Sequence, residues 1–277
     1  RAAKEAGVKI VYDADARLDA VPPENVAAVV YRDQKLGEVR EIVRLSNCVT
    51  VSTAALAAVR RGWEGAAGKV RVLPNHIPAS IWPERHPADA RLFTILWAGS
   101  PTHKRDLALM AGDLLSFMEA YKEARFICFG EAMPAILEQV RDQVQVLPFV
   151  SFEEYAQSLA SVGADIMVAP LEDTEFNRGK SAMKCLEAGA CGYPILCSPV
   201  GEYQVIKAAG APVTLVRDGH WIDAFELSKS LKADLPAAGM ALREWVRANR
   251  CVLASKAGAW LEVIRELVTD AGNRKRP

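Results

Sequence analysis

The sequence predicts an α/β fold built on a doubly wound parallel sheet. Short apolar runs rich in β-branched residues alternate with helical stretches along most of the 277 residues, which is typical of strands joined by helical crossovers. The runs are almost wholly apolar, as expected of parallel strands covered on both faces. We therefore expect a partial α/β domain, then a complete doubly wound domain, then a helical C-terminus.

The first part of the chain carries the elements of the partial domain. Strands are expected at Val8–Asp13, Cys48–Ser52 and Val70–Leu73. Helices are expected within Lys35–Ser46 and at Thr53–Arg61, where the Thr53 hydroxyl suits the N-cap position.

Prolines mark the boundary between the two domains. Pro74, Pro78, Pro83 and Pro87 lie close together, and proline fixes φ and removes a backbone donor, so regular structure is not expected there. We assign residues 1–73 to the end of one domain, 74–92 to a linker, and 93–277 to the second domain with its terminal helices.

The second domain carries a longer and more regular alternation. Its expected strands are Phe93–Ala98, Arg125–Phe129, Val144–Leu147, Ala164–Ala169, Pro194–Cys197 and Val213–Val216. Its expected helices are Asp106–Tyr121, Met133–Arg141, Phe152–Ser161, Ser181–Ala190 and a helical region from Trp221 to about Val268, before a frayed basic tail at Asn273–Pro277. Ligands of such sheets bind at the carboxyl ends of the strands, so the loops there are the expected site.

Composition excludes several classes of protein. Lys+Arg and Asp+Glu both number 34, and this balance argues against a nucleic-acid-binding protein. No apolar run approaches the roughly 20 residues of a transmembrane helix, and the N-terminus lacks the form of a signal peptide. The six cysteines include no C-x-x-C pair and no metal-ligand pattern, so we expect reduced, buried thiols in a cytoplasmic protein. Because the chain begins with Arg1, we expect a piece of a longer polypeptide.

The loop after the strand Phe93–Ala98 has the parts of a phosphate site. Gly99 allows close approach of the backbone, Ser100 and Thr102 offer hydroxyls, and Lys104 brings positive charge. The helix that follows adds roughly half a positive charge at its N-terminus. The alternative is a plain turn with Asp106 as the helix cap.

A second polar loop, Pro170–Ser181, also connects a strand to a helix. Gly179-Lys180-Ser181 resembles the end of a Walker A loop, but that motif requires glycine at the position of Thr174. We therefore reject a P-loop NTPase. An anion could still bind Lys180, Ser181 and the free backbone N–H groups of the helix start; the alternative is a capped helix after a solvated loop.

The helix after this loop brings together two charged side chains. Lys184 and Glu187 are three residues apart and therefore share a helix face. A carboxylate held in a cleft suits the two hydroxyls of a ribose, although a single helical glutamate is more often solvated.

These residues, in this order, resemble a known family. The segments concerned are Gly99 to Lys104 after a strand, Pro170, Gly179-Lys180-Ser181, Lys184 with Glu187, Gly192-Tyr193-Pro194, and the Leu73-Pro74-Asn75 turn. They are similar to the C-terminal, donor-binding domain of GT-B glycosyltransferases, in particular bacterial retaining enzymes of the glycogen-synthase and mannosyltransferase type. The resemblance extends from about Val8 to about Leu267 and implies Rossmann-like domains.

The resemblance implies a nucleotide-diphosphate sugar as donor substrate, with no cofactor and no metal. Lys104 would contact the diphosphate, Glu187 the ribose, Phe149 and Val150 the base, and the loop Glu175–Ser181 the sugar and phosphates. The implied donor-binding residues are Gly99, Ser100, Thr102, His103, Lys104, Phe149, Val150, Glu175, Lys180, Ser181, Lys184 and Glu187.

One position departs from the family pattern. Glu187 matches the second glutamate of the family's E-x7-E motif, whereas the first falls on Gly179, so that Glu175 or Asp173 would have to substitute. The family's acceptor site, and often a catalytic histidine, belong to the N-terminal domain, of which only the end is present. The catalytic residues are therefore unknown, and we expect the chain alone to be inactive.

The expected function is sugar transfer in bacterial surface polysaccharide or glycoconjugate synthesis. The acceptor would be a glycan, a lipid-linked molecule or a protein, and peripheral membrane association is left open. Two alternatives remain, namely a nucleotide-sugar epimerase of the same fold and a non-catalytic scaffold, which Gly179 favours.

Overall fold

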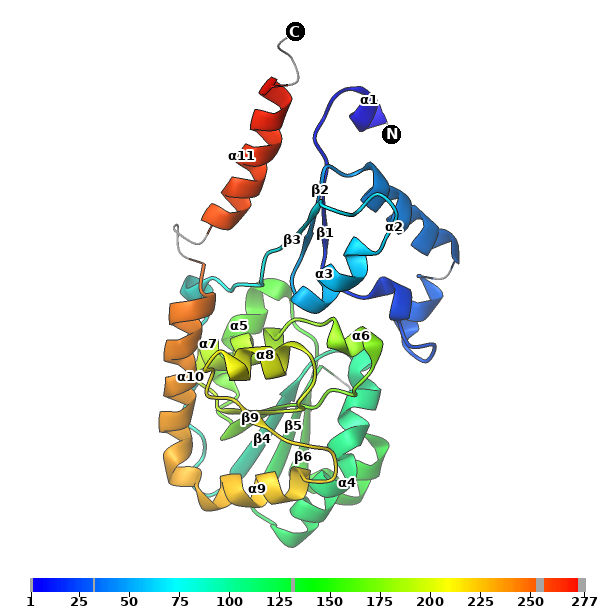
Figure 1. Ribbon diagram of the computed structural model, residues 1–277. Helices are drawn as coiled ribbons and strands as arrows, with labels where there is room; N and C mark the ends of the chain where they lie inside the picture. Colours follow the sequence, from blue (N-terminus) through cyan, green and yellow to red (C-terminus); the bar gives the residue numbers. More distant parts are fainter. Residues whose placement is uncertain (1, 32, 131–132, 253–256, 274–277) are drawn as a thin grey trace. The chain divides into compact units, whose positions relative to one another are not determined.

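A computed structural model describes residues 2–31, 33–130, 133–252 and 257–273 (Figure 1). The α-helices are α1 (Ala2–Glu5), α2 (Asp33–Leu45), α3 (Ala54–Arg61), α4 (Lys104–Ala120), α5 (Phe152–Ser161), α6 (Glu175–Arg178), α7 (Met183–Cys191), α8 (Glu202–Ala208), α9 (Trp221–Ser230), α10 (Leu235–Arg250) and α11 (Gly258–Asn273). The strands are β1 (Val11–Ala14), β2 (Cys48–Val51), β3 (Val70–Val72), β4 (Phe93–Ala98), β5 (Ala124–Phe129), β6 (Val144–Leu147), β7 (Ile166–Ala169), β8 (Ile195–Cys197) and β9 (Thr214–Leu215). Short 3₁₀ helices are η1 (Leu18–Ala20), η2 (Val26–Val29), η3 (Ala79–Ile81), η4 (Pro101–His103), η5 (Ala135–Gln143) and η6 (Lys232–Asp234).

The chain forms two compact units. Unit 1 comprises Arg1–Asn75, Thr174–Ser181 and Val252–Pro277, and unit 2 comprises His76–Asp173 and Ala182–Cys251. The segment 174–181 and the C-terminal residues from 252 are thus grouped with the N-terminal residues, although the sequence analysis placed them in the second domain. Each unit is described by itself below.

Unit 1 contains a three-stranded parallel sheet in the order β1-β2-β3. All four residues of β2 are buried because it is the central strand, and Val43, Val49, Val51 and Leu56 form the core around it. The expected cap is confirmed, since Thr53 Oγ1 accepts a hydrogen bond from the backbone N–H of Leu56 at 3.1 Å. The first strand begins at Val11, three residues later than the predicted start at Val8.

Unit 2 contains a six-stranded, wholly parallel sheet in the order β6-β5-β4-β7-β8-β9. The first strand of the unit, β4, lies in the middle, and the chain winds outward from it in both directions. This order creates a topological switch point between β4 and β7, where a ligand crevice is expected at the carboxyl ends of the strands. The prediction of an α/β fold with a doubly wound parallel sheet is confirmed.

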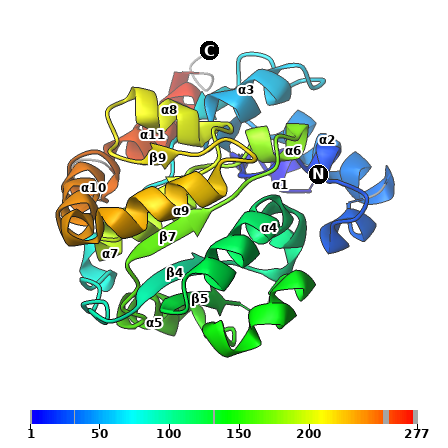
Figure 2. The ribbon, with the colours of Figure 1, turned by 90° about the horizontal axis from the view of Figure 1, so that it is seen from below.

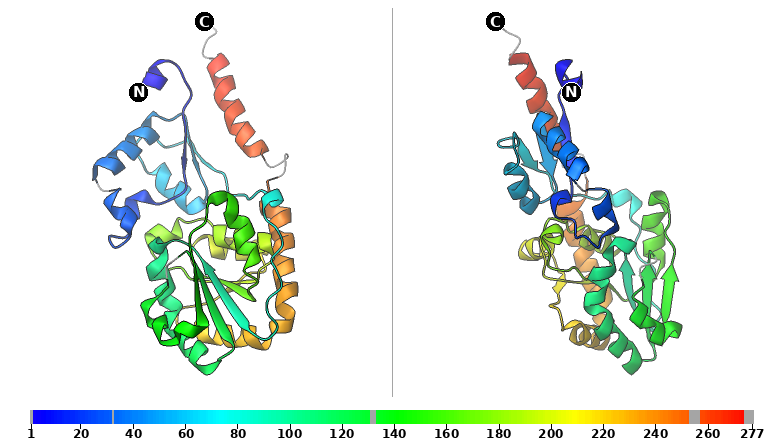
Figure 3. Two further views of the ribbon diagram at one scale, coloured as in Figure 1. Left: turned by 180° about the vertical axis from the view of Figure 1, so that it is seen from behind. Right: turned by 90° about the vertical axis from the view of Figure 1, so that its right-hand side faces the viewer.

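Helices cover both faces of this sheet. Successive side chains of each strand point to opposite faces, and both faces are apolar. In β4, Leu96 and Ala98 belong to one core cluster, whereas Phe93, Ile95 and Trp97 belong to the other. The first cluster packs against α5, α7 and α10, and the second against α4 and α9. Helices α10 and α4 flank the strands in Figure 1, α9 and α4 are neighbours in Figure 2, and Figure 3 shows the twisted strands from behind.

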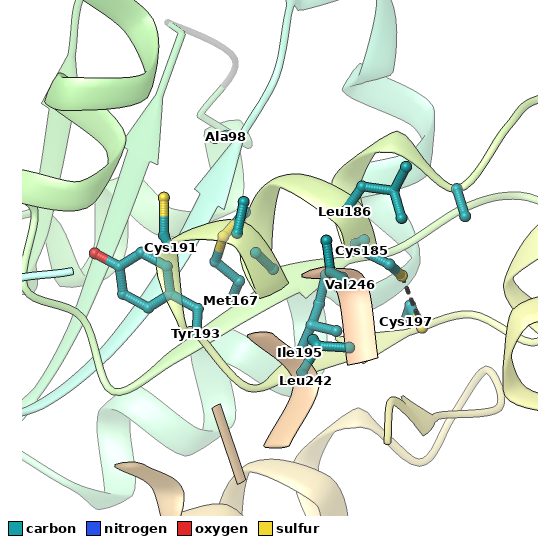
Figure 4. Packing of buried hydrophobic residues seen from close by; sticks show 14 of the residues in the cluster. Ala98, Met167, Cys185, Leu186, Cys191, Tyr193, Ile195, Cys197, Leu242 and Val246 are labelled. Carbon is teal, nitrogen blue, oxygen red and sulfur yellow. Dashed lines mark hydrogen bonds between the residues drawn. The ribbon is translucent and has the colours of Figure 1, made fainter. Parts of the chain in front are cut away.

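The expectation that the cysteines are buried is confirmed. All six are free and buried. Cys185 and Cys197 face each other between α7 and β8, with their sulfur atoms 3.9 Å apart, and Met167, Ile195 and Val246 pack in the same cluster (Figure 4).

Several predicted elements of unit 2 differ in extent. The stretch after β5 forms the 3₁₀ helix η5 with a kink at Val140, not an α-helix, and α8 was not predicted. The expected linker is largely irregular, apart from η3 and a single parallel bridge between Ile77 and Cys251. Helix α7 begins at Met183, two residues later than predicted.

The C-terminal region is helical as predicted, but its last helix runs further. Helices α9, α10 and α11 account for most of it, and α11 continues to Asn273. The remaining tail residues, 274–277, lie outside the described part of the chain. Among the residues that the structure describes, none belongs to a helix with the length and apolar character needed to cross a bilayer.

Candidate functional site

A pocket of about 290 Å³ opens in unit 2 where β4, β5 and β6 end. It is lined by Gly99, Ser100, His103, Phe129, Gly130, Phe149, Val150, Tyr155 and Lys184. The loops after three neighbouring parallel strands therefore form one wall, while α5 and α7 contribute Tyr155 and Lys184 to the other. The pocket thus lies at the carboxyl edge of the sheet, where doubly wound sheets bind their ligands, on the β5 side of the switch point between β4 and β7.

Two glycines keep the strand ends free of side chains. Gly99 follows β4 and Gly130 follows β5, and their backbones approach so closely that a Cβ on Gly130 would lie 1.8 Å from the carbonyl oxygen of Gly99. Gly130 also has φ of 113°, which disfavours any other residue. A Cβ on Gly99 would lie 2.6 Å from the ring of Trp97. Both glycines are therefore required by packing, and they line the pocket with backbone that carries no side chain.

The turn between β4 and α4 holds a histidine in a fixed position. His103 Nδ1 lies 2.7 Å from Asp106 Oδ2, and Asp106 is buried. The other oxygen of Asp106 accepts a hydrogen bond from the backbone N–H of Glu172 at 2.8 Å, which joins this turn to the loop after β7. Asp106 is thus a tertiary anchor rather than the helix cap considered as the alternative. Beside it, the hydroxyls of Ser100 and Thr102 are hydrogen-bonded at 2.6 Å.

A hydrogen-bonded triangle joins α5 to α7. Lys184 Nζ donates to Glu187 Oε2 at 2.7 Å and to the phenol oxygen of Tyr155 at 3.1 Å. The phenol donates in turn to Glu187 Oε2 at 2.9 Å. Lys184 and Tyr155 line the pocket, and Glu187, which is only 8% exposed, lies in direct contact with both. The predicted pairing of Lys184 and Glu187 on one helix face is confirmed.

The triangle also fixes the protonation of Lys184 and Tyr155. Burial alone would lower the pKa of Lys184, but the nearby Glu187 carboxylate and the Tyr155 phenol outweigh it and raise that pKa. Burial, together with the Glu187 charge, raises the pKa of Tyr155. Lys184 is therefore a cation and Tyr155 a neutral phenol throughout the physiological pH range.

Both walls also carry apolar surface. Phe149 and Val150 follow β6, and more than half of the Phe149 side chain is exposed. The Tyr155 ring packs edge-on against Trp82 and tilted against Phe129, with ring centroids 6.0 Å and 5.7 Å apart. The pocket thus places apolar surface beside a cation and a carboxylate, a combination suited to an aromatic ring that carries a polar sugar.

The pocket gathers half of the residues that the sequence analysis assigned to the donor. Gly99, Ser100, His103, Phe149, Val150 and Lys184 all line it. Glu187 contacts the lining, Thr102 is bonded to Ser100, and Lys104 is exposed as the first residue of α4, next to His103.

Three lining residues were not foreseen, namely Phe129, Gly130 and Tyr155. A glycine directly after the second strand, like Gly99 after the first, was a usable signal for Gly130. Nothing in the local pattern of α5 marks Tyr155, because its role depends on contacts with α7.

Glu175, Lys180 and Ser181 belong to unit 1. Glu175 forms an ion pair with Arg17 at 3.2 Å, and Ser181 Oγ accepts a hydrogen bond from Asn75 Nδ2 at 2.9 Å. Lys180 Nζ lies 5.0 Å from the centroid of the Phe176 ring. Residues 175–178 form the short helix α6, capped by Thr174, where the sequence analysis expected a loop. Ser181 precedes α7, which begins at Met183, so the predicted helix start was two residues too early, and anion binding by Lys180 and Ser181 stays a prediction.

The packing around Gly179 explains the departure from the E-x7-E pattern. A Cβ there would lie 2.7 Å from Arg17 Cγ and 3.1 Å from Leu56 Cδ2. The Gly179 carbonyl accepts a hydrogen bond from Thr53 Oγ1 at 3.2 Å, which holds the segment against α3. This position therefore has no room for a glutamate side chain in the observed arrangement.

Known proteins resemble the segment that carries the pocket. The family model of the glycosyl transferases group 1 matches residues 93–229. Sucrose-phosphate synthase from Thermosynechococcus elongatus is similar in structure, with a TM-score of 0.71 and 18% identity over 95% of this chain and 69% of that one. HepE from Anabaena, in complex with UDP and glucose, has a TM-score of 0.68 and 14% identity over 95% of this chain and 73% of that one.

A third similar structure is WaaG, described as a glycosyltransferase involved in lipopolysaccharide biosynthesis. Its TM-score is 0.63 and its identity 16%, over 86% of this chain and 70% of that one. No curated protein sequence matches this chain. At these identities the structural likeness establishes the fold, and the family model establishes the family of the segment that carries the pocket. Residues 93–229 therefore belong to the glycosyl transferases group 1, in a chain that has the GT-B glycosyltransferase fold.

Proposed function

We propose that this chain is the donor-binding part of a glycosyltransferase that uses a UDP-sugar. The observation that carries the proposal is the pocket at the ends of β4, β5 and β6, where Lys184 and Glu187 form an ion pair beside the exposed Phe149. The structure of HepE with UDP and glucose supports uridine as the base, since that protein shares the fold. In this proposal Phe149 and Val150 contact the base, and Lys184 with Glu187 the ribose.

The diphosphate would lie over the turn between β4 and α4. In glycosyl transfer the bond from the anomeric carbon to the diphosphate oxygen breaks, and the diphosphate leaves with the electron pair. Preorganised donors that face this developing charge lower the barrier. The backbone at Gly99, the N-terminal end of α4 and Lys104 are the groups proposed for this role.

Calorimetric titration tests the proposal directly. We expect UDP to bind to the chain more tightly than GDP or ADP, and Glu187→Ala and Lys104→Ala each to weaken UDP binding by about tenfold or more. The exposed Lys122→Ala serves as a control of equal charge change. Absence of UDP binding, or binding indifferent to both substitutions, would contradict the site.

Metal removal gives a second test, because the proposed charge stabilisation relies on protein cations alone. We expect the affinity for UDP to be the same in EDTA and in excess Mg²⁺ or Mn²⁺. A large loss of affinity in EDTA would instead assign part of the diphosphate binding to a metal ion.

For the acceptor and the cellular setting, we propose only broad classes. The likeness to WaaG supports a role in surface polysaccharide or glycoconjugate synthesis, with a glycan, lipid-linked or protein acceptor and the cytoplasm as the compartment. Incubation of a longer protein that contains this chain with UDP-sugars and lipid-linked acceptors, followed by mass spectrometry, tests this assignment.

The packing at Gly179 favours one second candidate, a non-catalytic scaffold. Without a carboxylate at that position, a donor could bind without being transferred. Tight binding of UDP-sugars by the longer protein, with neither transfer to acceptors nor hydrolysis, would select this candidate; release of free sugar would reject it.

A further inference from the structure

The phenol of Tyr155 joins two helices at the pocket wall, because Tyr155 lies on a different helix from its hydrogen-bond partners. Tyr155 belongs to α5, whereas Lys184 and Glu187 belong to α7. Its oxygen uses both of its hydrogen-bonding capacities, because it accepts from Lys184 Nζ at 3.1 Å and donates to Glu187 Oε2 at 2.9 Å. Its ring is fixed independently by Trp82 and Phe129.

This geometry leaves hydrogen-bonding capacity on both members of the ion pair, of which Lys184 lines the pocket and Glu187 is in contact with Lys184. Glu187 Oε2 accepts from both Lys184 and Tyr155, so Oε1 keeps its acceptor capacity. An ammonium has three protons, and two of the Lys184 protons are directed at Glu187 and Tyr155. One proton therefore remains on a side chain that lines the pocket.

A free carboxylate oxygen beside a free ammonium proton complements a vicinal diol. Each hydroxyl of a diol can donate to the carboxylate and accept from the ammonium. The match requires both charged groups to keep a constant separation. A lysine on a single helix has several rotatable bonds and loses rotamer entropy when it is held, so a second helix that holds it beforehand lowers the cost of binding.

We propose that Tyr155 is a positioning residue whose phenol holds Lys184 and Glu187 as one unit for the 2′- and 3′-hydroxyls of a ribonucleoside diphosphate. The inference rests on the proposed function and adds a residue and a selectivity to it. Tyr155 thereby favours ribonucleotides over nucleotides that lack the diol, without itself contacting the reacting atoms.

The test compares UDP with 2′,3′-dideoxy-UDP by calorimetry on the full chain. For the parent protein we expect UDP to bind about tenfold or more tightly than the dideoxy compound. Tyr155→Phe keeps the ring and its contacts with Trp82 and Phe129 but removes the hydroxyl. We expect it to weaken the affinity for UDP by about tenfold and to leave the affinity for the dideoxy compound nearly unchanged. The preference for UDP should therefore largely disappear.

A matched control is Tyr193→Phe. Tyr193 is also a buried tyrosine of unit 2, but its hydroxyl donates to the carbonyl of Leu159 at 3.0 Å, away from the pocket lining. This variant should lower the melting temperature without changing the preference for UDP. Lys184→Met, which keeps the aliphatic stem, removes the ammonium that the phenol holds and should abolish the preference as Tyr155→Phe does. Adding Tyr155→Phe to Lys184→Met should change the preference no further, and a further loss in the double variant would contradict a role of the phenol through Lys184.

The outcomes separate the inference from the function on which it rests. The positioning role is refuted if the parent binds UDP and Tyr155→Phe keeps the full preference for UDP. It is also refuted if Tyr155→Phe weakens the affinity for both nucleotides by the same factor. In both cases the donor site stands. If the parent binds neither nucleotide, the proposed function fails and the inference fails with it.

Discussion

At the scale of single residues, glycines decide where this chain can bind a ligand. Gly130 combines a positive φ with a backbone neighbour that a Cβ would strike, and it lies at the end of β5 where the pocket opens. Gly112, inside α4, has no neighbour within 4 Å of its Cβ position. The two glycines therefore differ in kind, although both belong to the same unit.

We expect Gly130→Ala to destabilise the protein by about 2 kcal/mol or more, since strain at positive φ adds to a backbone clash. Gly112→Ala should be neutral or stabilise by about 0.5–1 kcal/mol, because alanine is the better helix former. Thermal unfolding of both variants checks the difference. Equal melting temperatures would show that the strand ends can separate without cost.

A second residue-scale prediction concerns Gly179, the departure from the family's motif. Gly179→Glu restores the motif in sequence but must displace Arg17 and the buried Leu56. We expect a loss of about 1–3 kcal/mol from overpacking and no gain in UDP affinity. Gly37→Glu, on α2 with open space around its Cβ position, is the control. The packing argument would be contradicted if Gly179→Glu bound UDP more tightly than the parent and unfolded at the same urea concentration.

At the scale of elements, α5 supports the pocket through its first turn. Ser151 caps the helix, and Ser151 and Glu154 form a reciprocal capping box in which each side chain bonds to the other's backbone N–H. Tyr155 follows directly on the next residue. The local sequence of α5 thus fixes the residue at which the helix starts. The start of the helix in turn fixes the position of the Tyr155 phenol relative to Lys184 and Glu187 on α7.

Ser151→Ala is expected to cost about 1 kcal/mol, the usual value for loss of an N-cap. Ser158→Ala, seven residues further along the same helix, should cost much less. Urea denaturation curves of the two variants provide the measurement. A weaker preference for UDP over its dideoxy analogue in Ser151→Ala alone would further link the cap to the placement of Tyr155.

At the scale of the whole molecule, unit 2 buries thiols and phenols that resist ionisation. Burial raises the pKa of Cys191 to about 12, against an ordinary value near 9, with a further contribution from Glu187. Burial likewise raises the pKa of Tyr193 to about 12 from an ordinary value of 10. Both groups stay neutral in the folded chain at a pH where they ionise in the unfolded chain.

The sign of the pH dependence follows from these two groups. Their folded pKa values lie above the unfolded ones, so their contribution is complete below about pH 9 and is lost as the pH rises toward 12. Near pH 10.5 we expect Cys191 alone to account for a loss of about 2 kcal/mol relative to pH 8. Urea denaturation at both pH values measures the loss, and Cys191→Ala should show a shallower decline; identical slopes would contradict the assignment.

The sequence by itself determined the strands and the loops that form the pocket, because both depend on residues that are neighbours in the chain. The apolar runs Phe93–Ala98 and Arg125–Phe129 are strands, and Gly99, Ser100, His103, Phe149 and Lys184 do meet at one pocket. A short apolar run and a glycine after it can be recognised without knowledge of distant partners.

Only the tertiary structure decided what depends on contacts between elements that are distant in the chain. Tyr155 reaches Glu187 across 32 residues, Asp106 anchors the backbone of Glu172 across 66, and Thr53 binds the carbonyl of Gly179 across 126. No local pattern encodes such pairs, since each partner alone is an ordinary helical or loop residue. The physical reason is that a hydrogen bond depends on spatial proximity and direction, which the path of the whole chain sets.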